Sequence, residues 1–202
     1  MRTLLMITCL FLIGWTHFND TPEDFGRKLS NIAREFRDNI MDEDESRSLM
    51  HDASRVADDI EDQIKSGDYS AADVAKFRAE KKKAEALEAY IGAVGGCANS
   101  LPTIEDLNLA NGIVGGKVTD LVPGKFCVDF ISVTINDYIV YLGENNTNSN
   151  YTVSYNWKAS DAMNSGNGTM GILSNGVRHI YDNREKPNQR NITIYGVSCQ
   201  PF

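Results

Sequence analysis

The chain has 202 residues, enough for one medium domain or two small ones, and its hydrophobic content of 42% is that of an ordinary soluble protein. Its formal net charge is −8, and residues 19–96 carry 19 acidic and 12 basic residues. Phosphate backbones and anionic lipid surfaces repel such a chain, so nucleic acid and charged membranes are excluded as primary partners.

The first 18 residues have the layout of a secretory signal peptide. Arg2 supplies a positive start, an uncharged apolar run covers residues 3–15, and polar sequence follows at once. The apolar run is shorter than the about 20 residues that a membrane-spanning helix needs. We therefore expect a secreted protein, or one on the extracellular surface, that contacts a membrane only if residues 1–18 are retained as a short anchor.

Residues 19–96 predict a helical domain. In residues 21–41, Thr21 can cap a helix and apolar residues recur at spacings of three and four. The polar interval DEDESRS indicates a break or a bend before the apolar stripe resumes. A stop near Gly67 and a cap at Ser70 introduce a further helix over residues 71–94. Similar lengths and short connections predict a helical hairpin or a three-helix bundle.

The length of the first two helical segments bears on self-association. If they form one continuous helix, the third segment covers only about half of it. The uncovered half then needs another chain or the C-terminal domain. On this ground we expect a homo-oligomer, with the helical part acting as a stalk.

The pattern changes in the second half of the chain. Residues 97–116 are predicted to be a linker with at most one helical turn. In residues 117–202 the apolar period falls to two, which predicts a small antiparallel β-sheet or sandwich. Asn136–Asp137 and Asn175–Gly176 each separate two apolar runs and predict tight hairpins. The expected fold class is therefore α+β.

Three cysteines follow the predicted leader. In an oxidising compartment two of them are expected to pair, which leaves the third without a partner in the same chain. Cys127 and Cys199 are the preferred pair, since both lie in strand-like sequence of one domain. Cys97 is then the odd thiol, or links this chain to another. A Cys97–Cys199 bridge that fastens the tail to the end of the helices is the alternative.

Five asparagines begin sequons for N-glycosylation: Asn19, Asn145, Asn150, Asn167 and Asn191. Their clustering over residues 145–167 predicts exposed loops. In a eukaryotic or viral protein these asparagines would carry glycans, whereas in a bacterial protein they would be polar turn residues.

The sequence carries no pattern typical of catalysis. The three histidines are not spaced as metal ligands, and no nucleophile motif or phosphate cradle is present. We therefore expect no catalytic residue, no metal ligand and no cofactor. The strictly alternating segment NYTVSYNW places Tyr151, Tyr155 and Trp157 on one face, which is either buried core or a recognition platform for a protein or glycan partner.

Together these features predict an exported, non-enzymatic binding or assembly protein, with a self-associating helical stalk and a disulfide-locked β domain that presents polar recognition loops. A first alternative is a filament subunit that retains its apolar N-terminus. In outline such a chain is similar to type IV pilins, although it lacks their longer apolar segment and early glutamate. A second alternative is a secreted enzyme whose site is not visible in the sequence.

Overall fold

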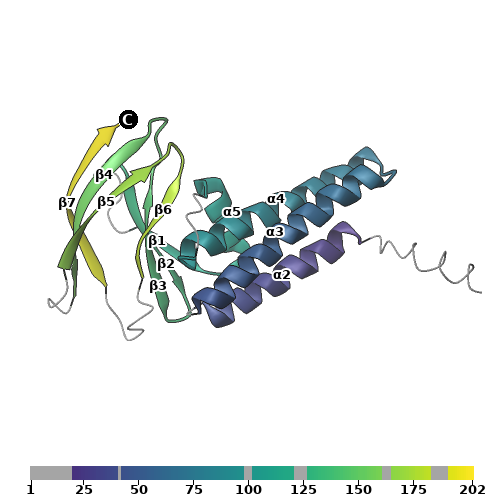
Figure 1. Ribbon diagram of the computed structural model, residues 1–202, viewed down its shortest axis with the longest axis horizontal. Helices are drawn as coiled ribbons and strands as arrows, with labels where there is room; N and C mark the ends of the chain where they lie inside the picture. The colour runs from purple at the N-terminus through teal and green to yellow at the C-terminus, as the bar shows by residue number, and fades with distance from the viewer. Residues whose placement is uncertain (1–19, 41, 98–101, 121–126, 161–164, 183–190) are drawn as a thin grey trace, which may run out of the picture.

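The computed structural model describes residues 20–40, 42–97, 102–120, 127–160, 165–182 and 191–202. This described part has three layers: helices, a four-stranded antiparallel sheet and a three-stranded antiparallel sheet (Figure 1). The fold is the predicted α+β arrangement, with the helices first and a β-sandwich second. The predicted leader lies outside the described residues.

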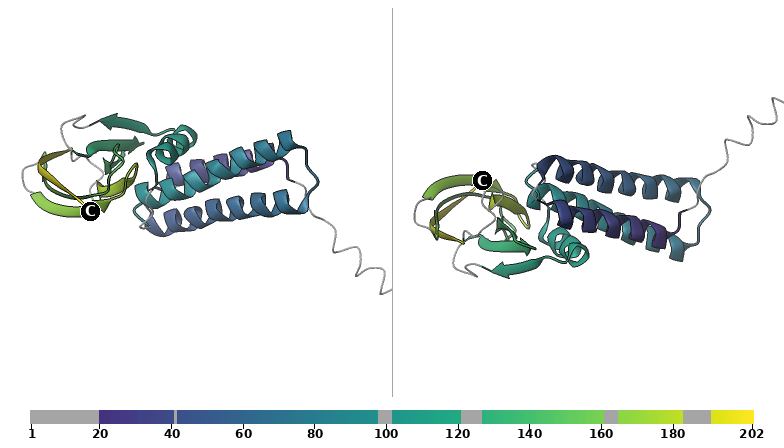
Figure 2. Two further views of the ribbon diagram at one scale, coloured as in Figure 1. Left: turned by 90° about the horizontal axis from the view of Figure 1, so that it is seen from above. Right: turned by 90° about the horizontal axis from the view of Figure 1, so that it is seen from below.

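The elements follow one another in the order α2 (Pro22–Asn39), α3 (Glu43–Ser66), α4 (Ala71–Val94), α5 (Ile104–Val114), β1 (Lys117–Asp120), β2 (Asp129–Ile135), β3 (Tyr138–Glu144), β4 (Tyr151–Ala159), β5 (Ser165–Ile172), β6 (Val177–Asp182) and β7 (Ile192–Pro201). The strand order is β1-β2-β3-β6 in one sheet and β5-β4-β7 in the other. We call the first the inner sheet, because it lies next to the helices, and the second the outer sheet (Figure 2).

Helices α2, α3 and α4 form an antiparallel bundle, because the polar interval between α2 and α3 starts a new helix. Asp42 caps α3 by accepting hydrogen bonds from the N–H groups of Asp44 and Glu45. The chain therefore turns back on itself, and α2 runs beside α3 in the opposite direction (Figure 2). Thr21 and Ser70 cap α2 and α4 as the sequence predicts.

The bundle removes the structural reason for expecting a helical stalk that self-associates. The continuous helix on which that expectation depended does not form, and α2 contacts both α3 and α4. The apolar stripe of α2 is buried inside the chain, with aromatic ring pairs at centroid distances of 6.2 Å between Phe25 and Phe77 and between Phe36 and Tyr90. A homo-oligomer remains a prediction without this support.

The predicted linker over residues 97–116 contains a true helix, α5. Thr103 and Asp106 form a capping box at its start, and Gly115 ends it in the left-handed conformation with a φ of 81°. Its buried residues Leu107, Ala110 and Val114 follow a helical spacing and pack into the same core as the bundle. The segment is therefore part of the helical layer.

The central strands of the inner sheet, β2 and β3, are buried on both faces. Ile131, Val133 and Ile135 of β2 pack with the helices, whereas Phe130 of β2 and Tyr141 of β3 pack with the outer sheet. Alternation along each strand sends successive side chains to opposite faces, which explains why β2 is buried at most of its positions, whichever face they lie on. Because one core joins the helices to the inner sheet, the helical and β parts fold around shared apolar surface.

The two predicted hairpins have different outcomes. Asn136 has a φ of 53° in the tight turn between β2 and β3, which pair along their whole length. Asn175 also adopts a positive φ of 54°, but the turn at Asn175–Gly176 leads from β5 in the outer sheet to β6 in the inner sheet. The prediction of a hairpin there is wrong, because the turn residues set the local bend and the core sets which strands pair.

The shared core predicts one cooperative unfolding transition. Leu107 of α5 is 1% exposed, and we expect Leu107→Ala to lower the free energy of unfolding by about 2–5 kcal/mol. In a Trp15→Phe background, far-UV circular dichroism reports the helices and Trp157 fluorescence reports the sandwich. Both signals should shift together to lower denaturant. Separate transitions for the two signals would contradict a shared core, and His51→Ala, at an exposed site on α3, is the control.

Candidate functional site

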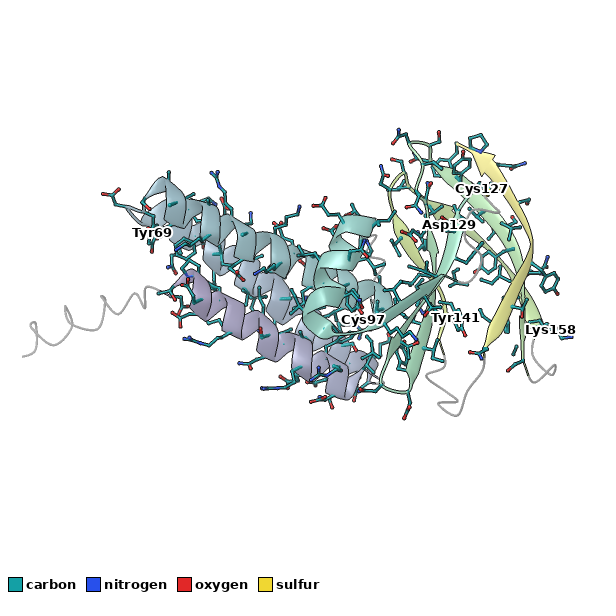
Figure 3. The ribbon with its side chains drawn as sticks, turned by 180° about the vertical axis from the view of Figure 1, so that it is seen from behind. Tyr69, Cys97, Cys127, Asp129, Tyr141 and Lys158 are labelled. Carbon is teal, nitrogen blue, oxygen red and sulfur yellow. A yellow bond between two sulfur atoms is a disulfide. The ribbon has the colours of Figure 1, made fainter. Side chains whose placement is uncertain are left out.

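A disulfide joins the two sheets of the sandwich. Cys127 lies just before β2 and Cys199 lies in β7, with their Cα atoms 6.2 Å apart (Figure 3). This confirms the predicted Cys127–Cys199 pair and excludes the alternative Cys97–Cys199 bridge. The crosslink closes 72 residues of chain and fixes the outer sheet to the inner one.

Cys97 follows α4 and lies on the helical side of the molecule, away from the disulfide (Figure 3). Its side chain is half-buried against the helical core, and its Sγ donates a weak hydrogen bond to the carbonyl oxygen of Ile91 at 3.7 Å. An interchain link through this thiol remains a prediction.

The predicted aromatic platform faces the interior of the sandwich. Tyr155 is 8% exposed, and Tyr151 and Trp157 are half-buried against the same core between the sheets. Their rings fit there because β5 presents glycines opposite them: a Cβ at Gly168 would lie 2.5 Å from the Tyr155 ring, and one at Gly166 would lie 2.9 Å from the Trp157 ring. Burial also raises the pKa of Tyr155. The interpretation of these residues as a recognition platform is therefore wrong.

Asn145 holds the β3–β4 loop in place and is fully buried. Its Nδ2 donates hydrogen bonds to the carbonyl oxygens of Ser149 at 2.7 Å and Leu173 at 2.9 Å, and its Oδ1 accepts from Thr147. A glycan on Nδ2 would replace one of these hydrogens and would need space that the core fills. The structure therefore contradicts Asn145 as a glycan site.

The asparagines of the remaining sequons differ in how accessible they are for attachment of a glycan. Asn167 and Asn191 are exposed. Asn150 is half-buried and accepts a hydrogen bond from the Ser174 N–H through its Oδ1, an acceptor that a glycosylated amide keeps. Asn167 lies in β5 and not in the loop that the asparagine cluster predicts. Asn19 lies outside the described residues.

The outer sheet has one face turned away from the rest of the molecule, and we call it the outer face. Along each strand, the side chains that alternate with the inward-facing ones lie on the outer face. The register aligns them in rows across β5, β4 and β7. Figure 3 shows Lys158 on this side, away from the helices. The rows are Ser165–Lys158–Thr193, Asn167–Asn156–Tyr195, Thr169–Ser154–Ser198 and Gly171–Thr152–Gln200.

The large hydrophobic side chains that are exposed in the described chain gather at this sheet. Tyr195 of β7 is 48% exposed, Phe202 follows β7 and is 67% exposed, and Leu173 follows β5 and is 45% exposed. The Phe202 ring lies across the outer face, since its Cζ is 3.9 Å from the position that a Cβ at Gly171 would take. Sequence reasoning missed this surface because the alternation of β4 drew attention to the aromatic face, which is the buried one.

Charges gather on the helices. Lys81, Lys82 and Lys83 form ion pairs with Glu61, Glu105 and Glu80, respectively. The pKa of the Glu61 carboxyl is lowered, first by the hydrogen bond from Lys81 and then by the one from Lys65. These basic residues are therefore neutralised locally, as expected for a solvated helical surface.

Within the described ranges, no group of three or more His, Cys, Asp or Glu side chains is placed to hold a metal ion. In the same part of the chain, no helix combines the length and the apolar character required for crossing a bilayer. Comparison with protein-family models, curated proteins and solved structures found no match.

The Asn145 hydrogen bonds can be tested by substitution. Asn145→Ala leaves two carbonyl oxygens and the Thr147 N–H without this buried partner, so we expect the free energy of unfolding to fall by about 1–3 kcal/mol. Chemical denaturation measures the change. The matched control is Asn191→Ala, which also removes a sequon asparagine but at an exposed site, and should stay within about 0.5 kcal/mol of the parent. Equal effects of the two substitutions would contradict the structural role of Asn145.

Proposed function

We propose that this chain is an exported, non-enzymatic binding protein that displays a disulfide-locked β-sandwich at one end of a helical bundle. The Cys127–Cys199 disulfide is the observation that carries the proposal. Structural disulfides form and persist in oxidising compartments and are rare in the cytosol. This agrees with the signal-peptide layout of residues 1–18, which indicates the same compartment independently.

The three-layer order supports binding through the outer sheet. The helices cover one face of the inner sheet and the outer sheet covers the other, so both of its faces are used in folding. The outer sheet uses one face for the core and leaves the outer face available to a partner (Figure 1). We assign recognition to this face, in place of the inward-facing residues Tyr151, Tyr155 and Trp157.

A non-enzymatic role is supported by how the ionisable side chains are used. Asp52, the neighbour of His51 on α3, forms an ion pair with Arg55 on the helix surface. Glu43, Glu61 and Asp73 likewise pair with a Lys or Arg one helical turn away on the helix surface. Pairs of this kind are typical of a solvated surface and not of an acid–base site.

Export and oxidation can be tested on the natural full chain. Expressed from residue 1 in a secreting cell, the protein should be recovered outside the cell, and reduction should add two hydrogen atoms to its intact mass from the one disulfide. Thiol labelling before and after reduction, followed by peptide mapping, should place the new thiols at Cys127 and Cys199. Recovery from a reducing interior with both thiols already labelled would overturn the proposal.

The disulfide should also contribute strongly to stability. Closing 72 residues of chain corresponds to about 4 kcal/mol in the chain-entropy model. We expect the double variant Cys127→Ser, Cys199→Ser to lose roughly 2–5 kcal/mol in the free energy of unfolding. Cys97→Ser is the matched control and should lose well under half as much. Equal losses in the two variants would mean that the crosslink adds no constraint of its own.

A further inference from the structure

The outer face is nearly free of charge, in contrast to the rest of the chain. Charged residues make up 24% of the sequence, but Lys158 is the one charged residue among the twelve positions of the four rows. The others are hydroxyls, amides, a glycine and Tyr195. A merely solvated sheet face in so acidic a protein has no reason to avoid charge, whereas depletion of charge with an exposed aromatic residue is typical of a binding surface.

The centre of this face presents hydrogen-bonding groups in a fixed arrangement. Asn156 lies between Asn167 and Tyr195 in one row. Gly196 adopts a positive φ of 60° at the bulge of β7, and a Cβ there would lie 2.6 Å from Nδ2 of Asn156. The glycine thus gives the Asn156 amide its space. In the next row, the hydroxyls of Ser154 and Thr169 are 3.1 Å apart and hold each other in place.

Two exposed aromatic residues lie on either side of the row that contains Ser154 and Thr169. Tyr195 is in the Asn156 row, and the Phe202 ring lies over the row of Gly171 and Thr152. Four strand residues separate the rows, which is about 13 Å at the usual rise of a strand. The polar row of Thr169, Ser154 and Ser198 lies between the rings. A ligand that matches this surface must offer apolar patches at both ends and hydroxyl-type groups between them.

From this arrangement we infer that the outer face binds a neutral oligosaccharide chain. Sugar rings present apolar C–H faces that stack on aromatic rings, and hydroxyl groups that exchange hydrogen bonds with amides and serine or threonine hydroxyls. The absence of charge matches a neutral ligand, because a charged one would find only Lys158. A protein partner fits less well, because protein interfaces gather apolar side chains at a buried centre, and here one polar row separates the two apolar rings.

This inference rests on the proposed binding function, but it is tested separately from export. The oxidised full-length protein, free of N-linked glycan, is run by affinity electrophoresis in gels containing a soluble neutral β-glucan, a mannan or a xylan, and is mixed with insoluble cellulose. Hyaluronan and heparin serve as charged probes. We expect retardation or retention by at least one neutral probe and by neither charged probe. Failure on every neutral probe overturns the inference, while secretion with an intact disulfide would leave the proposed function standing.

Variants of the two rings locate the site. Tyr195→Ala and Phe202→Ala should each weaken binding at least tenfold, and Tyr195→Phe, which keeps the ring, should bind within about threefold of the parent. His51→Ala on the exposed surface of α3 is the control and should leave binding unchanged. Unaltered thermal unfolding of each variant shows that the sandwich remains folded. Parent-like affinity in both alanine variants overturns the assignment.

Two further results would also overturn it. If sedimentation shows a dimer that Tyr195→Ala dissociates, the outer face binds a second copy of the chain instead of a sugar. If natural material carries a glycan on Asn167, that glycan covers the central row and the face is shielded from a free ligand. A monomer with an unmodified Asn167, together with the binding results above, supports the inference.

Discussion

The burial of both faces of the inner sheet is the constraint on which the rest of the structure depends. β2 and β3 give one set of side chains to the helices and the alternate set to the outer sheet. Each fully buried side chain of the size of Val133 or Phe130 stabilises the fold by roughly 1.5–3 kcal/mol relative to exposure. Neither the bundle nor the outer sheet could be removed without exposing one apolar face of this sheet. The helical and β parts are therefore interdependent.

This constraint decides which surfaces are left for function. The bundle surface is charged and many of its Lys and Arg side chains are held in ion pairs, and the inner sheet has no face to offer. The outer sheet is the terminal layer, so its second face is uncovered, and Lys158 is the one charged residue in the four rows of that face. The location of the candidate site thus follows from the order of the layers more than from any single motif.

Local sequence signals predicted much of the fold. Thr21 and Ser70 mark helix starts, the alternation of β4 is real, and the strand context of Cys127 and Cys199 identified the disulfide. The capping box of Thr103 and Asp106 was equally present in the sequence, but the short apolar stripe behind it hid α5 in an apparent linker. Apart from the disulfide, which joins residues 72 positions apart, these successes and this miss concern interactions between residues close in sequence.

Other features depended on contacts between distant residues, which no local pattern contains. Alternation shows that one face of β4 is apolar, but only the inner sheet determines that this face is covered. The neighbours of Asn145 in the sequence make it the start of a sequon. In the fold it is buried and donates a hydrogen bond to the carbonyl oxygen of Leu173. The Asn175 turn bends as expected, yet the core sends β6 to the other sheet. The candidate site was missed for the same reason, since exposure is a property of the assembled layers.

The position of the crosslink within β7 has a mechanical consequence. β7 is an edge strand that hydrogen-bonds to β4 alone in the outer sheet. A force applied at Phe202 would break its hydrogen bonds to β4 one after another. Cys199 lies three residues before Phe202 and is bonded to Cys127, beside the inner sheet. Separation of β7 from β4 that starts at that end must stop at the disulfide, which transmits the force to the inner sheet. A tether attached at the outer face could therefore bear tension while the strand stays in register.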